Sequence, residues 1–410
     1  MQTGRPSQPC PLAGSSEDPP PGAEDRWAAV GLVAVATFVV VAAEMMPVGL
    51  LTPMGSTLQV SEGTVGLSLT ITGLVAAATA PLVPAVAGRT DRKKVLVALM
   101  ALVALSNAVT ALAPTFAVLA GARVLLGVSM GGVWALAASL APVLVSPLAV
   151  ASATTLIFSG IAVASVLGVP LGTFIGGVAG WRASFWALAA AGALVAASMV
   201  VALPSIPPGE QSASAGVRAV LRSPGVRTGL TITALLVAAH FSAYTYVRPA
   251  LEVLAGVDTS LVATMLLVYG GLGVVGTFVV GRAAVRAPQT VVLVLSSGIA
   301  ITLLTVGTVV SSPLVAGALV AVWGLLYGGV SVSTQSWVAR SAADRERVSA
   351  LWVAVFNASI AVGALGGGQV YDSAGPARLF WVAAGLAAVA LLVAVVGSRS
   401  PRHTRARPVR

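Results

Sequence analysis

The chain has 410 residues, of which 57% are hydrophobic and only 9% are charged. Soluble globular proteins carry about 25% charged residues, so this composition excludes a water-soluble enzyme or binding domain and predicts an integral membrane protein. The formal net charge of +10 would suit a polyanionic partner, but the positions of the basic residues give it another explanation.

Twelve apolar stretches are long enough to cross a membrane. A helix needs about 20 apolar residues to span the hydrocarbon core of a bilayer, and charges, prolines and turn residues divide this chain into stretches of that length. Their uniformly apolar character favours helices over the alternating segments of a β-barrel. The predicted fold is an all-α membrane protein with twelve transmembrane helices, at about residues 27–51, 64–87, 94–112, 116–140, 152–176, 183–203, 228–250, 260–281, 289–309, 313–337, 348–369 and 377–397.

The basic residues follow the order of these stretches. Most of the 23 Lys and Arg residues fall in segments that share one side of the membrane if the chain begins in the cytoplasm. By the positive-inside rule, this bias predicts a multi-pass protein of the cell (inner or plasma) membrane with both termini cytoplasmic. The basic residues therefore report topology, and no nucleic acid partner is predicted.

Polar segments divide the chain into two halves and two tails. Residues 1–26 are predicted to be a disordered cytoplasmic tail, and residues 398–410 form a basic one. The polar segment 204–227 separates residues 27–203 from residues 228–397, with six predicted helices in each half. Two related halves joined by a cytoplasmic linker are a known plan of secondary transporters, which bind their solute near mid-membrane between the halves.

Five sequence motifs, in order along the chain, point to one family. They are "AEMMPVGLL" (43–51), "GVPLGTFIGGVAGWRASFW" (168–186), "TYVRPALEVLAG" (245–256), "YGGLGVVGTFVVGR" (269–282) and "FNASIAVGALGGG" (356–368). With them the chain resembles the major facilitator superfamily, and within it the twelve-span drug:proton antiporter branch that includes bacterial sugar, nucleoside and chloramphenicol exporters. The resemblance implies two pseudo-symmetric six-helix halves, alternating access, and a protein that usually works as a monomer.

Glu44, in "VVVAAEMMPVGL" (39–50), is the only acidic residue inside a predicted helix. An ionised residue at the bilayer centre costs about 2.5–3.5 kcal/mol on insertion scales, so such a carboxyl should face a cavity and exchange a proton. We expect proton coupling or contact with the solute, and the resemblance agrees, because this glutamate position is typical of the branch. The alternative is a structural carboxylate held by a neighbouring helix.

Arg123 and His240 also lie within predicted helices. At about 1.5 Å per residue, Arg123 and Glu44 both lie roughly 7–8 Å outward of the membrane midplane, so they could pair or compete for a proton. The resemblance implies that Arg123 helps proton transfer, whereas the alternative is an arginine that extends to the external surface. An imidazole ordinarily titrates near neutral pH, so His240 could relay a proton or contact the solute, or simply join two helices by a hydrogen bond.

The resemblance places the first, fourth, seventh and tenth helices around a central cavity. Few charges, several aromatic rings and several methionines suit a moderately apolar solute bound by adaptable surfaces, although ordinary packing explains such residues equally well. The expected cavity residues are Met45, Met46, Met130, Trp134, Tyr244, Tyr246, Trp323, Tyr327 and Gln335.

Two segments resemble family motifs that act in conformational change. "GRTDRKKVL" (88–96) resembles the loop between the second and third helices, although Gly88 stands where the family has an aspartate, and a plain basic loop is the alternative. Its charged residues are Arg89, Asp91, Arg92 and Lys93.

"GIAVASVLGVPLGTFIGG" (160–177) resembles the antiporter motif of the fifth helix, which in the family marks exporters. Its glycines clear one face of the helix so that a neighbouring helix can pack closely, and Pro170 precedes the position of the family's usual Gly-Pro. The residues concerned are Gly160, Gly168, Pro170, Gly172, Gly176 and Gly177.

These observations predict a proton-coupled exporter of a small organic solute, such as a drug, a secondary metabolite, a sugar or a nucleoside. The alternative on the same fold is an importer or a facilitator. Neither a metal-ligand cluster nor a nucleotide-binding loop is recognisable in the sequence, so no enzyme, cofactor or metal site is expected. The expected partners are the solute, protons and the lipid bilayer.

Overall fold

A computed structural model describes residues 25–80, 82–83, 90–206, 221–310, 312–342 and 345–399, and these residues contain helices and no strands. The first half comprises α1 (Trp27–Met45), η1 (Met46–Gly49), α2 (Leu51–Leu58), α3 (Glu62–Thr79), α5 (Arg92–Leu112), α6 (Phe116–Leu144), α7 (Val150–Val163), η2 (Ala164–Gly168), α8 (Val169–Ala179) and α9 (Trp181–Ala202). The second half comprises α11 (Pro224–Tyr244), α12 (Val247–Ala255), α13 (Thr259–Arg286), α14 (Pro288–Val309), α15 (Pro313–Gly328), α16 (Val330–Arg340) and α17 (Arg345–Arg399).

The described helices account for twelve membrane spans. Ten helical segments are long and apolar enough to cross a membrane, and the pair α2–α3, bent by 111°, supplies an eleventh. The twelfth arises because α17 contains two spans, separated at Gly375, whose φ of +81° interrupts the helix before Pro376. The predicted all-α fold is therefore confirmed. The sequence predicts a loop between the last two helices at residues 370–376, and the structure has a single non-helical residue there, Gly375.

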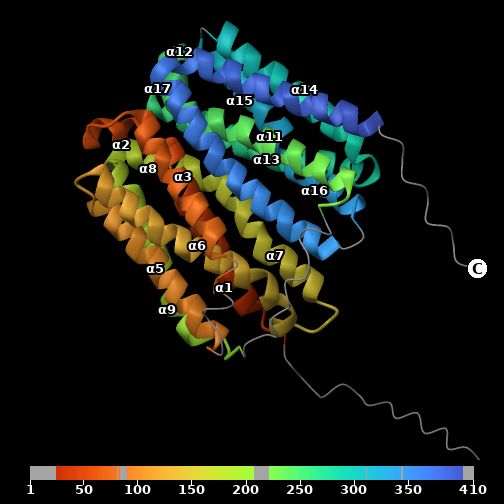
Figure 1. Ribbon diagram of the computed structural model, residues 1–410. Coiled ribbons are helices and arrows are strands. Elements are labelled where there is room, and N and C mark those ends of the chain that lie inside the picture. Colours follow the sequence, from red (N-terminus) through yellow and green to blue (C-terminus); the bar gives the residue numbers. More distant parts are fainter. Residues whose placement is uncertain are drawn as a thin grey trace, which may run out of the picture.

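The helices form two groups that lie side by side (Figure 1). Within the first half α1 contacts α7 and α9, and α5 contacts α6 and α9; within the second, α11 and α14 both contact α17. The halves meet where α3 lies along α17 and where α8 lies against α13. Most of the predicted linker, residues 207–220, lies outside the described residues.

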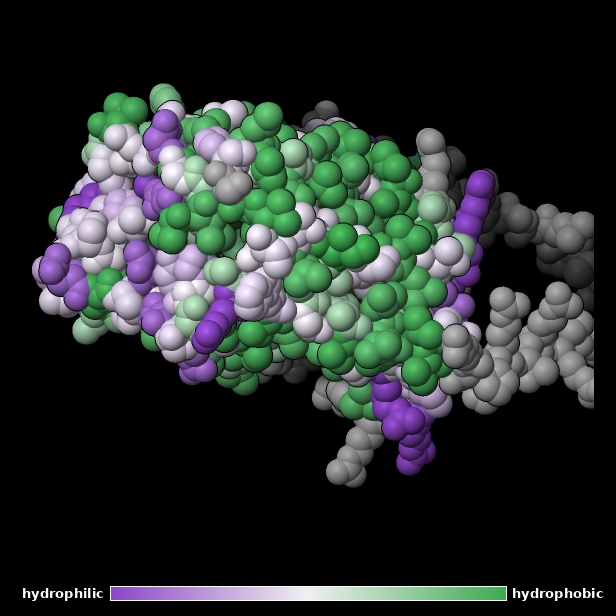
Figure 2. Space-filling view, turned by 90° about the horizontal axis from the view of Figure 1, so that it is seen from above, coloured by the Kyte–Doolittle hydropathy of each residue, from purple (hydrophilic) through white to green (hydrophobic). Residues whose placement is uncertain are grey.

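The two ends of the bundle differ. We call the end that carries η1, α2 and α12 the distal end, because it lies opposite the end at which the described chain begins and stops (Figure 1). Figure 2 shows a broad hydrophobic band with hydrophilic residues concentrated at the two ends of the molecule. Large apolar side chains such as Val201, Phe278 and Val178 are more than 70% exposed. An apolar surface of this extent suits the lipid of a bilayer.

Candidate functional site

Two prolines follow Glu44, one at the end of the first span and one in the short helix α2 that comes after it. Helix α1 ends at Met45, the 3-10 turn η1 follows, and α2 begins at Leu51. A proline has no backbone N–H and therefore cannot donate to the carbonyl four residues earlier. Pro47 thus removes the usual donor for the carbonyl of Ala43, and Pro53 removes that for Gly49.

Arg123 supplies a donor to the first of these carbonyls. Its Nη1 donates to the Ala43 oxygen at 3.0 Å, and its Nη2 donates to the Thr110 hydroxyl at 3.3 Å. The guanidinium also lies 4.9 Å from the ring centroid of Phe185. Arg123 is completely buried, so it does not extend to the external surface.

Glu44 is buried beside this arginine contact and makes no ion pair with it in the described part of the chain. The residue is 4% exposed, and its Oε1 has no hydrogen-bond partner among the described residues. The predicted similarity in depth agrees with the structure, since Arg123 binds the carbonyl of the preceding residue, Ala43. Of the two arrangements considered above, direct pairing is not the one observed, because the guanidinium is directed to the backbone.

The glycines of the fifth span lie against the first span. A Cβ on Gly160 would overlap the Ala34 carbonyl, and one on Gly172 would overlap the Met46 thioether. Gly168 and Gly176 similarly face Ala42 and Leu50, whereas Gly177 faces Thr259 of α13. The predicted close packing of this face is thus directed mainly at the span that carries Glu44.

Pro170 lies just after the π-helical turn η2, in the middle of the fifth span. A proline cannot donate within the helix, and an inserted residue that widens the turn accommodates the lost bond. The turn contacts both α1 and α13. The irregular part of this span therefore lies between the two halves of the protein.

Aromatic side chains of the second half form one stacked cluster around His240. The His240 ring lies 3.3 Å from that of Tyr327 and 4.9 Å from that of Tyr244, both in stacked orientation. Trp323 meets His240 edge-on at 5.3 Å, and Tyr269 stacks on Tyr244 at 4.8 Å. We call His240, Tyr244, Tyr269, Trp323 and Tyr327 the ring cluster.

Several polar atoms of the ring cluster have no partner. His240 Nδ1, Trp323 Nε1 and the Tyr327 hydroxyl are buried and unbonded among the described residues, while the Tyr269 hydroxyl lies 3.4 Å from His240 Nε2. Buried polar atoms are normally hydrogen-bonded. A group of stacked rings with free donors and acceptors can bind a flat molecule that carries polar atoms at its edge.

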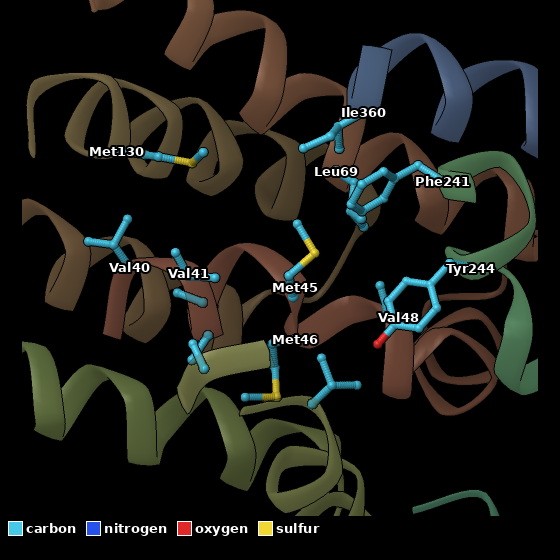
Figure 3. Close-up of a cluster of buried hydrophobic side chains, with 14 of the residues drawn as sticks. Val40, Val41, Met45, Met46, Val48, Leu69, Met130, Phe241, Tyr244 and Ile360 are labelled. Carbon is cyan, nitrogen blue, oxygen red and sulfur yellow. The ribbon is translucent and has the colours of Figure 1, made fainter. Parts of the chain in front are cut away.

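Met45 lies between Glu44 and the second half. Figure 3 shows its side chain directed toward Leu69 and Phe241, whereas Met46 points to the opposite side, toward the fifth span. The Tyr244 ring lies next to Val48 in the same view. Met45 and Val48 of the first half and Tyr244 of the ring cluster therefore belong to one buried hydrophobic cluster.

Other predicted cavity residues lie elsewhere. Trp134 stacks on Phe158 at 6.0 Å, and Met130 is buried apart from the rings (Figure 3). Tyr246 donates to the Ala364 carbonyl at 2.8 Å, and Gln335 is exposed on α16. The structure thus brings only part of the predicted set together.

The ring cluster also contains a residue that was not predicted. Tyr269 is on α13, a helix outside the four that the resemblance places around the cavity. Its signal in the sequence was the first letter of "YGGLGVVGTFVVGR", which served only to identify the family.

Asp91 joins the start of α5 to the segment that follows α9. Its carboxylate accepts hydrogen bonds from the backbone N–H groups of Ile206 (2.9 Å) and Lys93 (2.8 Å) and from the Ser205 hydroxyl (2.7 Å). The N–H of Ile206 contributes most to a pKa of Asp91 below its usual value. The N–H of Arg92 donates to the Ile206 carbonyl at 2.9 Å, and Arg89 lies outside the described residues.

The two halves are hydrogen-bonded to each other at the distal end. Arg248 of α12 donates through Nη1 to the Gly49 carbonyl, and Glu252 accepts from the Thr52 hydroxyl at 2.6 Å. On α17, Asp372 accepts from the backbone N–H of Gly63 at 3.0 Å and from the Ser61 hydroxyl. These bonds close the distal end in the described conformation.

An apolar groove of about 620 Å³ lies away from these residues. It is lined by α11 and both parts of α17, largely by alanine, valine, leucine and glycine side chains. None of the predicted site residues lines it, so we place the candidate site at the carboxyl and the ring cluster, where the polar atoms are.

Comparisons with known sequences agree with this architecture. The sequence model described as "Major Facilitator Superfamily" matches residues 33–350. "Transcription regulatory protein OpdE" of Pseudomonas aeruginosa is 35% identical over 388 residues, which cover 93% of this chain and 96% of that protein. "Purine ribonucleoside efflux pump NepI" of Salmonella paratyphi C is 34% identical over 376 residues, which cover 90% and 94% respectively.

Solved structures show the same fold. A bacterial homologue of the human lysosomal transporter Spinster, in an inward-facing and unoccupied conformation, has a TM-score of 0.76 at 15% identity and covers 95% of this chain and 100% of that one. The nucleoside transporter NupG has a TM-score of 0.73 at 12% identity and covers 91% and 99%. At these identities the likeness concerns the fold alone.

Proposed function

The chain belongs to the major facilitator superfamily of membrane transporters, and we propose that it exports a small organic solute in exchange for protons by alternating access. The observation that carries the proposal is a buried Glu44 whose Oε1 has no partner among the described residues, in a protein whose ring cluster also has buried polar atoms without a described partner. Met45, next to Glu44, belongs to the same buried hydrophobic cluster as Tyr244. Glu44 would carry the proton and the ring cluster would bind the solute.

Glu44 has the surroundings that a proton carrier needs. A partnerless carboxylate is costly inside a membrane protein, whereas a protonated carboxyl is not. Arg123 lies next to it but is occupied by the Ala43 carbonyl and Thr110. In the proposed cycle, Glu44 loses its proton when the site opens to the cytoplasm, and Arg123 then provides the nearby positive charge.

The proposed solute is a planar heteroaromatic compound, and a purine nucleoside is the first candidate. Stacking of a base on an aromatic side chain contributes about 1–3 kcal/mol. The free Nδ1 of His240, Nε1 of Trp323 and hydroxyl of Tyr327 would bond to the edge of such a base. The named activity of the relative NepI, purine ribonucleoside efflux, supports this choice.

We further propose a monomer in the cell membrane with both termini cytoplasmic, so that the distal end is external. The basic residues support this orientation, because Arg222, Arg227, Arg286 and Arg340 of the second half lie at the end opposite α12. No cofactor, metal or enzymatic step is part of the proposal.

Transport in everted membrane vesicles tests the proposal. Vesicles made acidic inside are given radiolabelled purine nucleosides, with pyrimidine nucleosides, sugars and antibiotics as a comparison panel. We expect uptake that collapses with an uncoupler, disappears in Glu44→Gln and persists in Glu62→Gln, which alters an acid at the membrane edge. Uptake that survives both the uncoupler and Glu44→Gln would refute proton coupling and favour the facilitator.

A further inference from the structure

We infer that Arg248 is a positioning residue that holds the first span in its distally closed shape, by giving the Gly49 carbonyl the hydrogen bond that Pro53 cannot donate. The inference holds for any solute and any coupling ion; only the external position of the distal end, which its test uses, rests on the proposed function.

The backbone of α2 shows why Gly49 needs a donor from elsewhere. The N–H of Met54 donates to the Leu50 carbonyl at 3.0 Å, as in a regular helix. The equivalent bond one residue earlier would run from the N–H of residue 53 to the Gly49 carbonyl, but Pro53 has no N–H. Arg248 Nη1 donates to that oxygen instead, and Gly49 is buried. An unpaired buried carbonyl destabilises a structure, so this bond is needed while the site is closed.

Arg248 is oriented by residues of its own half. Its Nε donates to Glu252 Oε1 at 2.8 Å, and its Nη2 donates to the Thr259 hydroxyl at 3.0 Å. The arginine is only 5% exposed. Because the guanidinium is planar and rigid, these two bonds direct Nη1 at Gly49. Glu252 then contacts the first half a second time, through the Thr52 hydroxyl.

Arg123 and Arg248 act on the two ends of the same turn. Arg123 binds the carbonyl of Ala43, just before η1, and Arg248 binds that of Gly49, its last residue. Arg123 belongs to the first half and can stay bonded throughout a cycle. Arg248 belongs to the second half, so its bond must break whenever the halves separate at the distal end. Opening of that end is thereby linked to the backbone at Gly49, five residues from Glu44.

Cysteine labelling tests this inference without a known solute. Cys10 is the only cysteine, so Cys10→Ser provides a cysteine-free background. Val48→Cys then reports opening of the distal end, because Val48 is completely buried in η1. The probe is a membrane-impermeant maleimide added to intact cells, and the measured quantity is the labelling rate of Val48→Cys with and without Arg248→Met.

We expect Arg248→Met to raise the labelling rate about ten-fold, the shift that loss of one charge-assisted hydrogen bond produces. Arg378→Met is the matched control, since Arg378 is an exposed arginine in the same distal region, and it should leave the rate unchanged. Ser56→Cys, exposed on α2, should label quickly in every background. An unchanged rate in Arg248→Met, with normal expression and melting temperature, would overturn the inference.

Pro53→Ala provides a second measurement that does not rely on Arg248→Met alone. Alanine restores an N–H at position 53, so Gly49 gains an intrahelical donor and depends less on Arg248. The ratio of labelling rates with and without Arg248→Met should therefore be smaller in the Pro53→Ala background. Equal ratios in the two backgrounds would show that the carbonyl is not what Arg248 holds.

Discussion

Each half begins with a helix that packs closely against a glycine-bearing helix of its own half, but the two pairs carry different side chains. In the first half, Gly160 and Gly172 of the fifth span allow the close approach of α1 and η1; in the second, Gly363 and Gly367 of α17 do the same for α11. A Cβ on Gly363 would lie 2.6 Å from the Ala238 carbonyl. The backbone arrangement is therefore repeated, whereas the chemistry is not.

The difference lies in what the approached helix presents. Helix α1 presents one carboxyl, with an arginine nearby, and α11 presents His240 and Tyr244 in a stack of rings. Repeated packing with divergent side chains lets one half specialise in the proton and the other in the solute, as proposed above. Four predictions test this comparison or set its scale, and they are ordered from the largest expected effect to the smallest.

Arg123→Met should reduce transport at least about 100-fold, because it leaves the Ala43 carbonyl unpaired and removes the positive charge next to Glu44. Arg123→Lys should restore part of the activity. Arg182→Met is the control, since Arg182 also bonds a carbonyl, that of Ala113 at 3.0 Å, but outside the first span. The measurement is vesicle uptake, and equal losses in the two arginine variants would contradict a special role of Arg123.

Tyr327→Ala should raise the half-saturating solute concentration about 10- to 100-fold, the loss expected when a stacking ring is removed. Tyr327→Phe keeps the ring and loses only the hydroxyl, so its effect should be about ten-fold or less. Both variants should keep the response of uptake to the pH gradient. Tyr371→Ala removes a ring outside the cluster, stacked on Tyr246, and should not change the solute dependence. If Tyr327→Ala bound solute normally, the ring cluster would not be the solute site.

Gly160→Ala and Gly363→Ala test whether the packing is equally important in the two halves. In both, the new methyl group meets a backbone carbonyl, which cannot move aside. We expect each to lower the free energy of unfolding by about 1–3 kcal/mol, as overpacked cores do, measured as a lower melting temperature in detergent. Gly172→Ala meets the flexible Met46 side chain and should cost less. The reverse order would argue against rigid backbone contact.

Asp91→Ala should have the smallest effect, at most about 1 kcal/mol, because the carboxylate is a largely solvated helix cap. The pKa of Asp91 is lowered in the fold, so its contribution is complete above the unfolded pKa, near 3.9, and disappears as the pH falls through the lower folded value. Wild type and Asp91→Ala should therefore differ in melting temperature at pH 7 and converge in acid. Asp258, which caps α13 through Leu261 at 2.9 Å without reaching another helix, gives the comparison variant Asp258→Ala. It should destabilise less than Asp91→Ala.

The sequence is sufficient for the spans and for three of the buried ionisable groups. Apolar stretches of membrane length report spans directly, and Glu44, Arg123 and His240 stood out because ionisable residues are rare in such stretches. All three are buried, while their roles remain predictions.

What the sequence could not supply were the partners. Where the helices cross decides which residues a tyrosine contacts. Tyr269 stacks on Tyr244 in the ring cluster, whereas Tyr246 donates to the Ala364 carbonyl. Arg248 lies near the external end of a predicted span, and the sequence does not mark it as a contact, because its acceptor is a backbone carbonyl 199 residues away.

The use of backbone carbonyls as acceptors has an evolutionary consequence. Every residue type carries a backbone carbonyl, so a change of residue at position 43 does not by itself remove the acceptor of Arg123. Position 49 is more restricted, because a Cβ there would overlap the Thr173 hydroxyl. A change at Arg123 or Arg248 removes the donor of the bond. A change at Pro47 or Pro53 restores a backbone N–H and so removes the need for that donor. Among relatives, we therefore expect Pro47 to vary together with Arg123, and Pro53 together with Arg248, as two separate pairs.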